Sequence, residues 1–432
     1  MHDFHYKNGE LLCEQVPLSR IVAKYGTPCY VYSNGTITDH FQKLDKALAP
    51  VDHTICYAVK ANSNLAVLKT VATLGGGFDV VSKGEIERVV AAGGDHNKCI
   101  FAGVGKTARE IEFALRLGIY AFNAESEAEL ERINAIAKRL RKKAPISVRV
   151  NPNVDAKTHA KITTGTYENK FGIAFEQVKK IYAKAAKLSN LKIKGVQMHI
   201  GSQLTTTDPF EGAVKKLIPL VTDLIKRYKI EFFSIGGGLG IVYDPALESG
   251  AASWWKKKEA AKILTPQSYA DRLIPLLKPL GIKILVEPGR FIAGNAGALI
   301  TQVEYIKKTG KKNFVIVDAA MNDLIRPAFY EAHHDIVPVK RKGGSKISSD
   351  VVGPICESGD TFCKNRPLPR VKEGDTLALL SAGAYAFVMA SNYNTRPMPA
   401  EVMVKGKQFT AVRERETPAS LWAHEKIPSW LK

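Results

Sequence analysis

The chain has 432 residues, of which 45% are hydrophobic and 24% are charged. These values predict a globular protein that is large enough for two domains. The sequence contains no apolar run of about 18 residues, and its first residues, Met1–Lys7, contain no apolar signal core. We therefore expect a cytoplasmic protein without a membrane span.

The net charge of +20 raises the question of a nucleic-acid ligand. The basic clusters, such as Lys138–Lys143 and Lys256–Lys258, lie far apart and carry no interleaved stacking motif. Solvated helix faces and loops explain them, so we expect no nucleic-acid partner. The six cysteines include no C-x-x-C pair, so we predict neither a disulfide framework nor a zinc site, and no other metal.

The first elements in chain order are a helix over residues 18–25, a strand over 27–33 and a helix over 37–48. From there, apolar runs alternate with helical patterns. The helical patterns cover residues 65–73, 84–92, 108–117, 127–140, 175–187, 210–228 and 266–277. The strand-like runs are Thr54–Lys60, Phe78–Ser82, Cys99–Gly103, Tyr120–Glu125, Ile146–Asn151, Gly195–Ile200, Phe232–Gly238 and Lys283–Arg290.

This alternation implies parallel strands joined by right-handed crossovers. Eight such units in about 250 residues match a (β/α)8 TIM barrel, which we assign to residues 34–296. A doubly wound open sheet is the alternative, but it usually has a glycine-rich turn after its first strand. Here the glycines follow the seventh strand.

After residue 290, the pattern changes to short strands separated by Gly, Pro and charged turns. These strands are predicted at 303–306, 314–317, 336–339, 376–380 and 401–404, with one helical turn at 384–390. We predict a second, mostly antiparallel β domain over residues 297–432, joined by the N-terminal segment 1–33.

Polar residues at the strand ends carry the functional prediction, because the C-terminal ends of barrel strands face the site. Each residue alone has an ordinary explanation, such as a solvated lysine, a core histidine or a tight turn. Together they suggest a common site: Lys60, Asp79, Ser82, Glu125, Asn151, His199, Ser202, Gly236–Gly240, Glu287 and Arg290.

These residues describe a pocket for an aromatic, anionic carbonyl cofactor. A partly desolvated Lys60 can lose its proton and form a Schiff base. The glycine turn offers backbone N–H groups to a phosphate, and His199 can lie against a ring. Glu287 can keep a pyridinium nitrogen protonated. Pyridoxal phosphate is the cofactor that needs all four groups.

Five motifs resemble those of the fold-type III pyridoxal-phosphate decarboxylases, over nearly the whole chain. They are Tyr57–Asn62, His199–Gln203, Gly236–Gly240, Glu287–Arg290 and Gly383–Tyr385. The resemblance implies an alanine-racemase-like barrel that binds pyridoxal 5'-phosphate. The predicted cofactor-binding residues are Lys60, Asp79, His199, Ser202, Gly236, Gly237, Gly238, Glu287, Gly289, Arg290 and Tyr385.

Further motifs resemble the branch of this family that converts meso-2,6-diaminopimelate to L-lysine and CO2, the last step of lysine biosynthesis. They are Asn151–Val154 with Thr158–His159, Lys170–Ile173, Arg326–Pro327 with Tyr330, Gly353–Asp360 and Ser391–Asn394. Within Gly353–Asp360, the pair Cys356–Glu357 resembles this branch, whereas the ornithine branch would have aspartate after the cysteine. The segment Leu247–Ile263 is longer and more basic than this resemblance leads us to expect.

The resemblance also implies a homodimer and a role for each residue. The catalytic residues would be Lys60, His199, Glu287 and Cys356, the last as a proton donor from the partner subunit. The substrate would contact Arg290, Arg326, Tyr330, Glu357 and Tyr385. The arginines suit the far carboxylate because a guanidinium binds it in a bidentate manner, and Glu357 suits the far amine.

Three alternatives remain open. A decarboxylase of the same fold could act on ornithine, arginine or a carboxylated polyamine precursor, although Arg326 and Glu357 argue against it. A cofactor carrier without catalysis would leave Cys356, Glu357 and Tyr330 without a purpose. A basic nucleic-acid-binding protein predicts salt-sensitive retention on polyanions.

Overall fold

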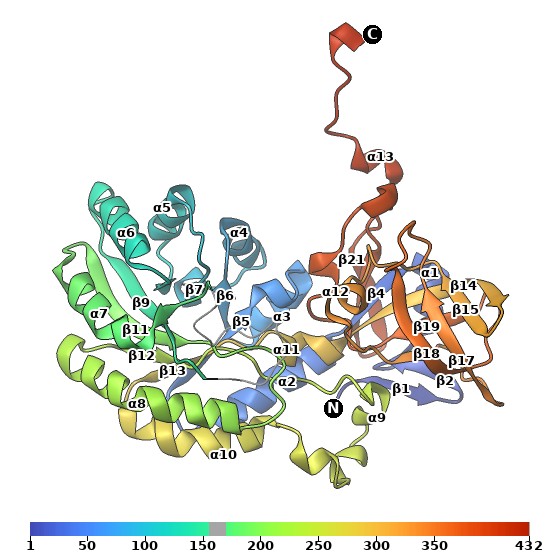
Figure 1. The fold of residues 1–432 in the computed structure, drawn as a ribbon, viewed down its shortest axis with the longest axis horizontal. Coiled ribbons are helices and arrows are strands. Elements are labelled where there is room, and N and C mark those ends of the chain that lie inside the picture. Colours follow the sequence, from blue (N-terminus) through green and yellow to red (C-terminus); the bar gives the residue numbers. More distant parts are fainter. Residues whose placement is uncertain (155–169, 432) are drawn as a thin grey trace. The chain divides into compact units, whose positions relative to one another are not determined.

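The computed structural model describes residues 1–154 and 170–431 (Figure 1). The chain divides into two compact units, which we call the barrel unit and the β unit. The barrel unit comprises Ile37–Ile241 and Lys256–Ile292, and the β unit comprises Met1–Thr36, Val242–Trp255 and Ala293–Lys432. Among the helices of the described residues, none combines the length and the apolarity that crossing a membrane requires.

The barrel unit is built on eight parallel strands that close on themselves, because β13 pairs with β5 and β8 pairs with β9. The strands are β5 (His53–Ala58), β6 (Gly77–Val80), β7 (Cys99–Phe101), β8 (Ala121–Ala124), β9 (Ala144–Asn151), β11 (Leu191–Met198), β12 (Phe232–Ser234) and β13 (Lys283–Val286). The short strand β10 (Ile173–Ala174) pairs with β9 beside this ring. The predicted (β/α)8 barrel is confirmed.

Most predicted barrel strands extend two or more residues past the observed C-terminal ends. The polar residues and glycines at those ends do not pair with a neighbouring strand and belong to the loops instead. Helices alternate with the strands and surround them in Figure 1. They are α2 (Asn34–Leu48), α3 (Leu65–Thr73), α4 (Lys83–Ala91), α5 (Ala108–Leu117), α6 (Glu127–Arg139), α7 (Val178–Lys187), α8 (Asp208–Tyr228) and α10 (Pro266–Leu277).

Local signals fix where several of these helices begin and end. The hydroxyl groups of Ser82, Thr107 and Ser126 cap α4, α5 and α6 by accepting a backbone N–H from the first turn. Thr107 and Glu110 form a full capping box, and Gly118 ends α5 in the left-handed conformation. The predicted first and last residues of α4, α5 and α6 therefore agree closely with the observed ones.

The barrel interior is apolar in one part and polar in another. Cys56, Ile100, Ala121, Phe232 and Leu285 form a buried cluster. In contrast, Arg149, Gln197 and Ser234 are neighbours in register on β9, β11 and β12, and all three are buried. This polar row leads directly to the strand ends that the sequence singled out.

The β unit contains a mostly antiparallel sheet in the order β18-β17-β15-β14-β4-β20-β21, with β19 on β14 and β16 on β19. The pairs β15–β17 and β4–β20 are parallel. The strands are β4 (Cys29–Ser33), β14 (Gly297–Thr309), β15 (Lys312–Val317), β16 (Ile336–Pro338), β17 (Lys346–Val352), β18 (Thr361–Pro369), β19 (Thr376–Leu379), β20 (Ala400–Lys405) and β21 (Gln408–Arg413). A separate small sheet joins β1 (Phe4–Lys7), β2 (Glu10–Cys13) and β3 (Val16–Pro17), followed by α1 (Leu18–Tyr25).

In the larger sheet of this unit, the strands β17, β18 and β21 were not predicted, and neither were the short strands β1, β2 and β3 of the small sheet. Exposed polar residues interrupt the apolar pattern of β17, β18 and β21, and β18 contains Pro367, which is tolerated because β18 is an edge strand. The unusual segment 247–263 forms short helical turns at Trp254–Lys256 and Ala260–Lys262, after α9 (Ala246–Ser249). Trp254 is buried, and the indole N–H of Trp255 donates to the carbonyl of Ser249 at 2.7 Å.

Candidate active site

Lys60 and Asp79 form an ion pair at the C-terminal end of the barrel. Lys60 lies on the 3-10 turn Val59–Ala61 directly after β5, and its Nζ is 2.5 Å from Oδ2 of Asp79 on β6. The side chain of Asp79 is 1% exposed, whereas that of Lys60 is 41% exposed. The amine is therefore accessible at the barrel mouth while it offsets the charge of a buried carboxylate.

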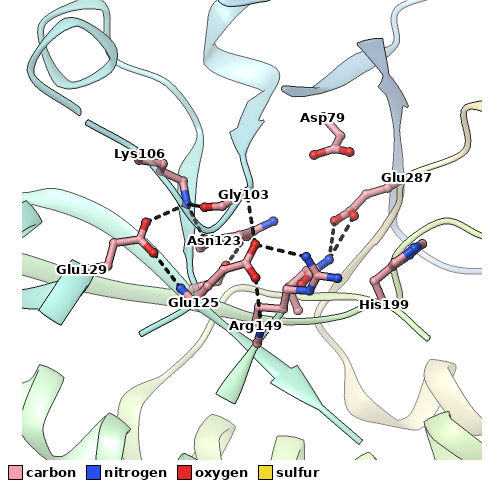
Figure 2. Close-up of polar contacts among 12 residues, drawn as sticks. Asp79, Gly103, Lys106, Asn123, Glu125, Glu129, Arg149, His199 and Glu287 are labelled. Carbon is pink, nitrogen blue, oxygen red and sulfur yellow. Dashed lines mark hydrogen bonds and ion pairs between the residues drawn. The ribbon is translucent and has the colours of Figure 1, made fainter. Parts of the chain in front are cut away.

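Glu287 is a second buried carboxylate at the same end of the barrel, directly after β13. Its Oε1 accepts a hydrogen bond from Ser234 Oγ at 2.6 Å, and its Oε2 accepts one from Gln197 Nε2 at 3.0 Å. Burial, and then the charge of Asp79, raise the pKa of Glu287 to about 7. Figure 2 shows the carboxyl groups of Asp79 and Glu287 facing one region, with His199 beside Glu287.

The raised pKa of Glu287 predicts how the stability of the cofactor-free protein depends on pH. Between the ordinary value of 4.5 and about 7, the folded state holds a proton that the unfolded state has lost. The contribution of this group to the free energy of unfolding therefore falls as pH rises through that window and is level above it. Urea unfolding of Glu287→Gln should show a weaker fall than the wild type over this window; parallel curves would contradict the assignment.

His199 lies just after β11 and contacts the glycine-rich loop. Its Nδ1 accepts the backbone N–H of Gly237 at 3.3 Å, which places the ring proton on Nε2. Burial and the nearby charges of Arg149 and Lys60 lower the pKa of His199 well below its usual value. The imidazole is therefore neutral, and a neutral imidazole is suited to pack its flat face against an aromatic ring.

The glycine loop is packed so tightly against its neighbours that larger residues would not fit. A Cβ at Gly236 would lie 2.3 Å from the carbonyl oxygen of Met198, and one at Gly237 would lie 2.2 Å from that of Glu287. The backbone of Gly236 has φ +72°, a conformation that favours glycine. This loop thus lies directly against both the His199 and the Glu287 loops.

Two further contacts join the predicted cofactor residues of the barrel unit. Arg290 Nη2 donates to Ser202 Oγ at 3.1 Å. A Cβ at Gly289 would lie 2.8 Å from the Cβ of Ala61, so the Glu287–Arg290 loop packs on the turn that carries Lys60. The loops after β5, β11, β12 and β13 are therefore connected with one another and, through Lys60, with Asp79 on β6.

A second polar network was not predicted from the sequence. The ammonium group of Lys106 donates to the carbonyls of Gly103 and Asn123, at 2.7 and 2.8 Å, and to Oε1 of Glu129 at 2.6 Å. The Lys106 side chain is 1% exposed. The other oxygen of Glu129 accepts the backbone N–H of Glu125 at 2.9 Å (Figure 2). Each of the three ammonium protons thus has an acceptor.

Glu125 extends this network to three loops. Its Oε1 accepts from the backbone N–H of Gly103 at 2.9 Å and from Arg149 Nη1 at 3.1 Å, and its Oε2 accepts from the backbone N–H of Gly172 at 3.0 Å. Figure 2 shows the guanidinium of Arg149 pointing at Glu125, on the side of the barrel that also holds His199. Glu125 was predicted at a strand end, and the structure gives it this bridging position.

We expect Lys106→Met to lower the free energy of unfolding by about 3–5 kcal/mol, because it leaves the buried carboxylate of Glu129 without its cation. Urea unfolding measures the change. The control is Lys184→Met, which removes an ion pair with Glu127 in which both side chains are more than one third exposed. A loss for Lys106→Met no larger than that for the control would contradict this interpretation.

The remaining predicted site residues belong to the β unit. Arg326 is buried at the start of α12 (Arg326–Tyr330), and Tyr330 ends the same helix. Cys356 and Glu357 are exposed, and the backbone N–H of Cys356 donates to Oδ1 of Asn394 at 3.0 Å. Tyr385 has a left-handed backbone with φ 55°. Thr158 and His159, which the sequence also singled out, lie outside the described residues.

Among the described residues, one group could hold a metal ion by proximity: Asp244, His333 and Asp335. Arg366 Nη2 lies 3.2 Å from Nδ1 of His333 and can only donate, so the ring proton is on Nε2. That nitrogen lies 3.0 Å from Oδ1 of Asp335 and donates to it. Both ring nitrogens are therefore committed, and the group is better explained as a hydrogen-bonded cluster.

Comparisons with known proteins agree with this geometry. Residues 34–294 match the family described as "Pyridoxal-dependent decarboxylase, pyridoxal binding domain". A protein of Vibrio cholerae serotype O1 named diaminopimelate decarboxylase is 50% identical over 430 residues, which cover 99% of each chain. A protein of the same name from Pseudomonas aeruginosa is 48% identical, again over 99% of each chain.

Solved structures give the same result. Diaminopimelate decarboxylase from Helicobacter pylori, complexed with L-lysine, is 40% identical with a TM-score of 0.88, covering 94% of this chain and 99% of that chain. The enzyme from M. jannaschii, in co-complex with L-lysine, is 36% identical with a TM-score of 0.91 over the full length of both chains. The cofactor-domain match across the barrel and the full-length identity of about one half together show that the chain belongs to the diaminopimelate decarboxylases, within the pyridoxal-dependent decarboxylase family.

Proposed function

We propose that the protein converts meso-2,6-diaminopimelate to L-lysine and CO2 with pyridoxal 5'-phosphate as cofactor. The observation that carries this proposal is the arrangement of Lys60, Asp79 and Glu287 with the loop Gly236–Gly238 at one end of the barrel. The names of the relatives supply the substrate, and the two solved relatives above were described with L-lysine, the expected product.

The residues at the barrel mouth fit this cofactor. Oδ1 of Asp79 is buried without a hydrogen-bond partner among the described residues, and the pKa of Glu287 is raised partly by Asp79. The two carboxyl groups therefore favour an additional buried cation beyond Lys60, and a protonated pyridine nitrogen would supply it. The backbone N–H groups of the Gly236–Gly238 loop would hold the phosphate.

When bound, the cofactor supplies an electron sink for the bond that breaks. Lys60 would hold the cofactor covalently through its aldehyde, and Asp79 would stabilise the ammonium group of Lys60 when that amine is free. Glu287 would hold a proton at the pyridine nitrogen, and the neutral ring of His199 would pack on the cofactor ring. Loss of CO2 leaves an electron pair on the substrate carbon, which must take up one proton; Cys356 of the partner subunit would deliver it from Sγ.

The far end of the substrate carries an amine and a carboxylate. We propose that Arg290, Arg326 and Tyr330 bind the carboxylate, that Glu357 of the partner subunit binds the amine and that Tyr385 contacts the cofactor. This assignment makes the protein a homodimer with shared sites. A substrate without one of these groups would leave a charged side chain unpaired, at a cost of about 1–3 kcal/mol.

The direct test is incubation of the purified protein with pyridoxal phosphate and meso-diaminopimelate, followed by assays for lysine and CO2. We expect both products, and little turnover of ornithine, arginine or a carboxylated polyamine precursor. Preferred turnover of one of those amines would replace the proposed substrate. Cofactor binding without release of CO2 from any of them would indicate a carrier instead of an enzyme.

The glycine loop gives a separate prediction for cofactor affinity. Gly237→Ala should raise the dissociation constant of pyridoxal phosphate about tenfold or more, because the new Cβ displaces the loop from the Glu287 carbonyl. Fluorescence titration of the cofactor-free protein measures it. Gly212→Ala, whose Cβ would meet nothing within 4 Å, is the control. Equal affinities for the two variants would argue against a phosphate site in this loop.

A further inference from the structure

The strongest further feature is a buried histidine beside Arg326 in the β unit. His334 lies between α12 and β16 and is fully buried. Its Nδ1 is 2.8 Å from the carbonyl oxygen of Leu380, which can only accept, so Nδ1 carries the ring proton. Its Nε2 is therefore an acceptor, and it lies 3.4 Å from the Nε–H of Arg326.

The backbone around His334 is fixed as well. The carbonyl of His334 accepts a hydrogen bond from Arg366 Nη1, and the backbone N–H of Leu380 donates to the carbonyl of Asp335 at 2.9 Å. These contacts fix the position of the His334 ring relative to β19, whose last residue directly precedes Leu380. The orientation of the imidazole, and with it the direction of its acceptor, is set by the fold.

Tyr243 contacts both side chains. Its ring makes an edge contact with the ring of His334 at a centroid distance of 5.5 Å and 82°. The guanidinium carbon of Arg326 lies 5.0 Å from the centroid of the Tyr243 ring. The imidazole of His334 is neutral, because burial and Arg326 itself lower the pKa of His334 to about 3.

We propose that His334, with Tyr243, is a positioning residue that sets the specificity of the site for a substrate carboxylate by orienting the guanidinium of Arg326. This inference rests on the proposed function, in which Arg326 binds the far carboxylate. The Nε–H is committed to His334, so the carboxylate would be bound through the two Nη groups. An acidic residue in the place of His334 would instead compete with the carboxylate for the same guanidinium.

The test compares two ligands of the holoenzyme that differ in the far carboxylate: L-lysine, which has it, and cadaverine, which lacks it. We expect His334→Leu to raise the inhibition constant of L-lysine, and KM for meso-diaminopimelate, about tenfold. The inhibition constant of cadaverine and the visible spectrum of the bound cofactor should be unchanged. His334→Gln, which can offer both a donor and an acceptor, should restore most of the affinity for L-lysine.

The variant Arg326→Ala distinguishes a failure of the proposed role of Arg326 from a failure of the inferred role of His334. If it leaves L-lysine inhibition unchanged, the proposed role of Arg326 is wrong and the inference falls with it. If Arg326→Ala weakens L-lysine and His334→Leu does not, or if His334→Leu weakens both ligands equally, only the inference about His334 is wrong. Should the leucine variant not fold, Tyr243→Leu tests the same arrangement: a selective loss for L-lysine supports it, and an equal loss for both ligands overturns it.

Discussion

Lys60→Ala should abolish both the visible absorption of the lysine-bound cofactor and the turnover of meso-diaminopimelate. The reason is that, among the residues that the structure describes, no other amine is paired with Asp79: the Lys60 amine follows β5 directly, is accessible, and is held by this buried carboxylate. Absorption spectra of the purified holoenzyme and steady-state rates measure the two effects. Normal turnover in this variant would overturn the assignment of Lys60.

Lys60→Arg is the matched control for this experiment. Arginine keeps a cation beside Asp79, so the ion pair and the local fold are retained, but it cannot bind the aldehyde covalently. We expect it to fold with nearly wild-type stability and to be as inactive as Lys60→Ala. An active arginine variant would mean that Lys60 acts through its charge alone.

Glu287→Gln should lower kcat by roughly 10²–10³-fold, the range for removing one preorganised electrostatic contact. The amide still accepts from Ser234 but carries no negative charge with which to hold a proton on the pyridine nitrogen. The cofactor should still bind through Lys60 and the glycine loop, so its spectrum should persist. Rates measured with saturating cofactor separate the loss of catalysis from a loss of binding.

Glu401→Gln provides a control for the burial of a carboxyl group. Glu401 is 2% exposed and accepts from the hydroxyl of Tyr32 at 2.7 Å, much as Glu287 accepts from Ser234. It belongs to the β unit and has no proposed role in the reaction. Equal losses of kcat in the two variants would mean that the effect of Glu287→Gln comes from a general loss of packing.

The barrel could be predicted from the sequence because its signals are local and repeated. Each strand is a short apolar run, and several helices carry their own caps, as Thr107 and Gly118 do for α5. Strands such as β18 could not be predicted in the same way. They are stabilised by pairing with distant partners, and the exposed residues around Pro367 carry no periodic pattern of their own.

The same distinction applies to the site. Lys60, His199, the glycines and Glu287 lie at strand ends and in recognisable motifs. Arg149, Gln197 and Ser234 were missed, although each is a polar residue between two apolar residues of a strand-like run, a signal that would have found them. Lys106 gives no such signal, since it lies in a loop of mixed composition and is buried only by partners from other loops.

The environment of Lys106 has a consequence for chemical selectivity. A primary amine reacts with an aldehyde only when it is deprotonated and able to approach the carbonyl carbon. The nitrogen of Lys106 donates to two main-chain oxygens and a carboxylate, so that all three of its protons are engaged and its side chain leaves no room for a carbonyl carbon to approach. Under the proposed function, Lys106 therefore cannot compete with Lys60 for the aldehyde of the cofactor, although both lysines belong to the same barrel unit.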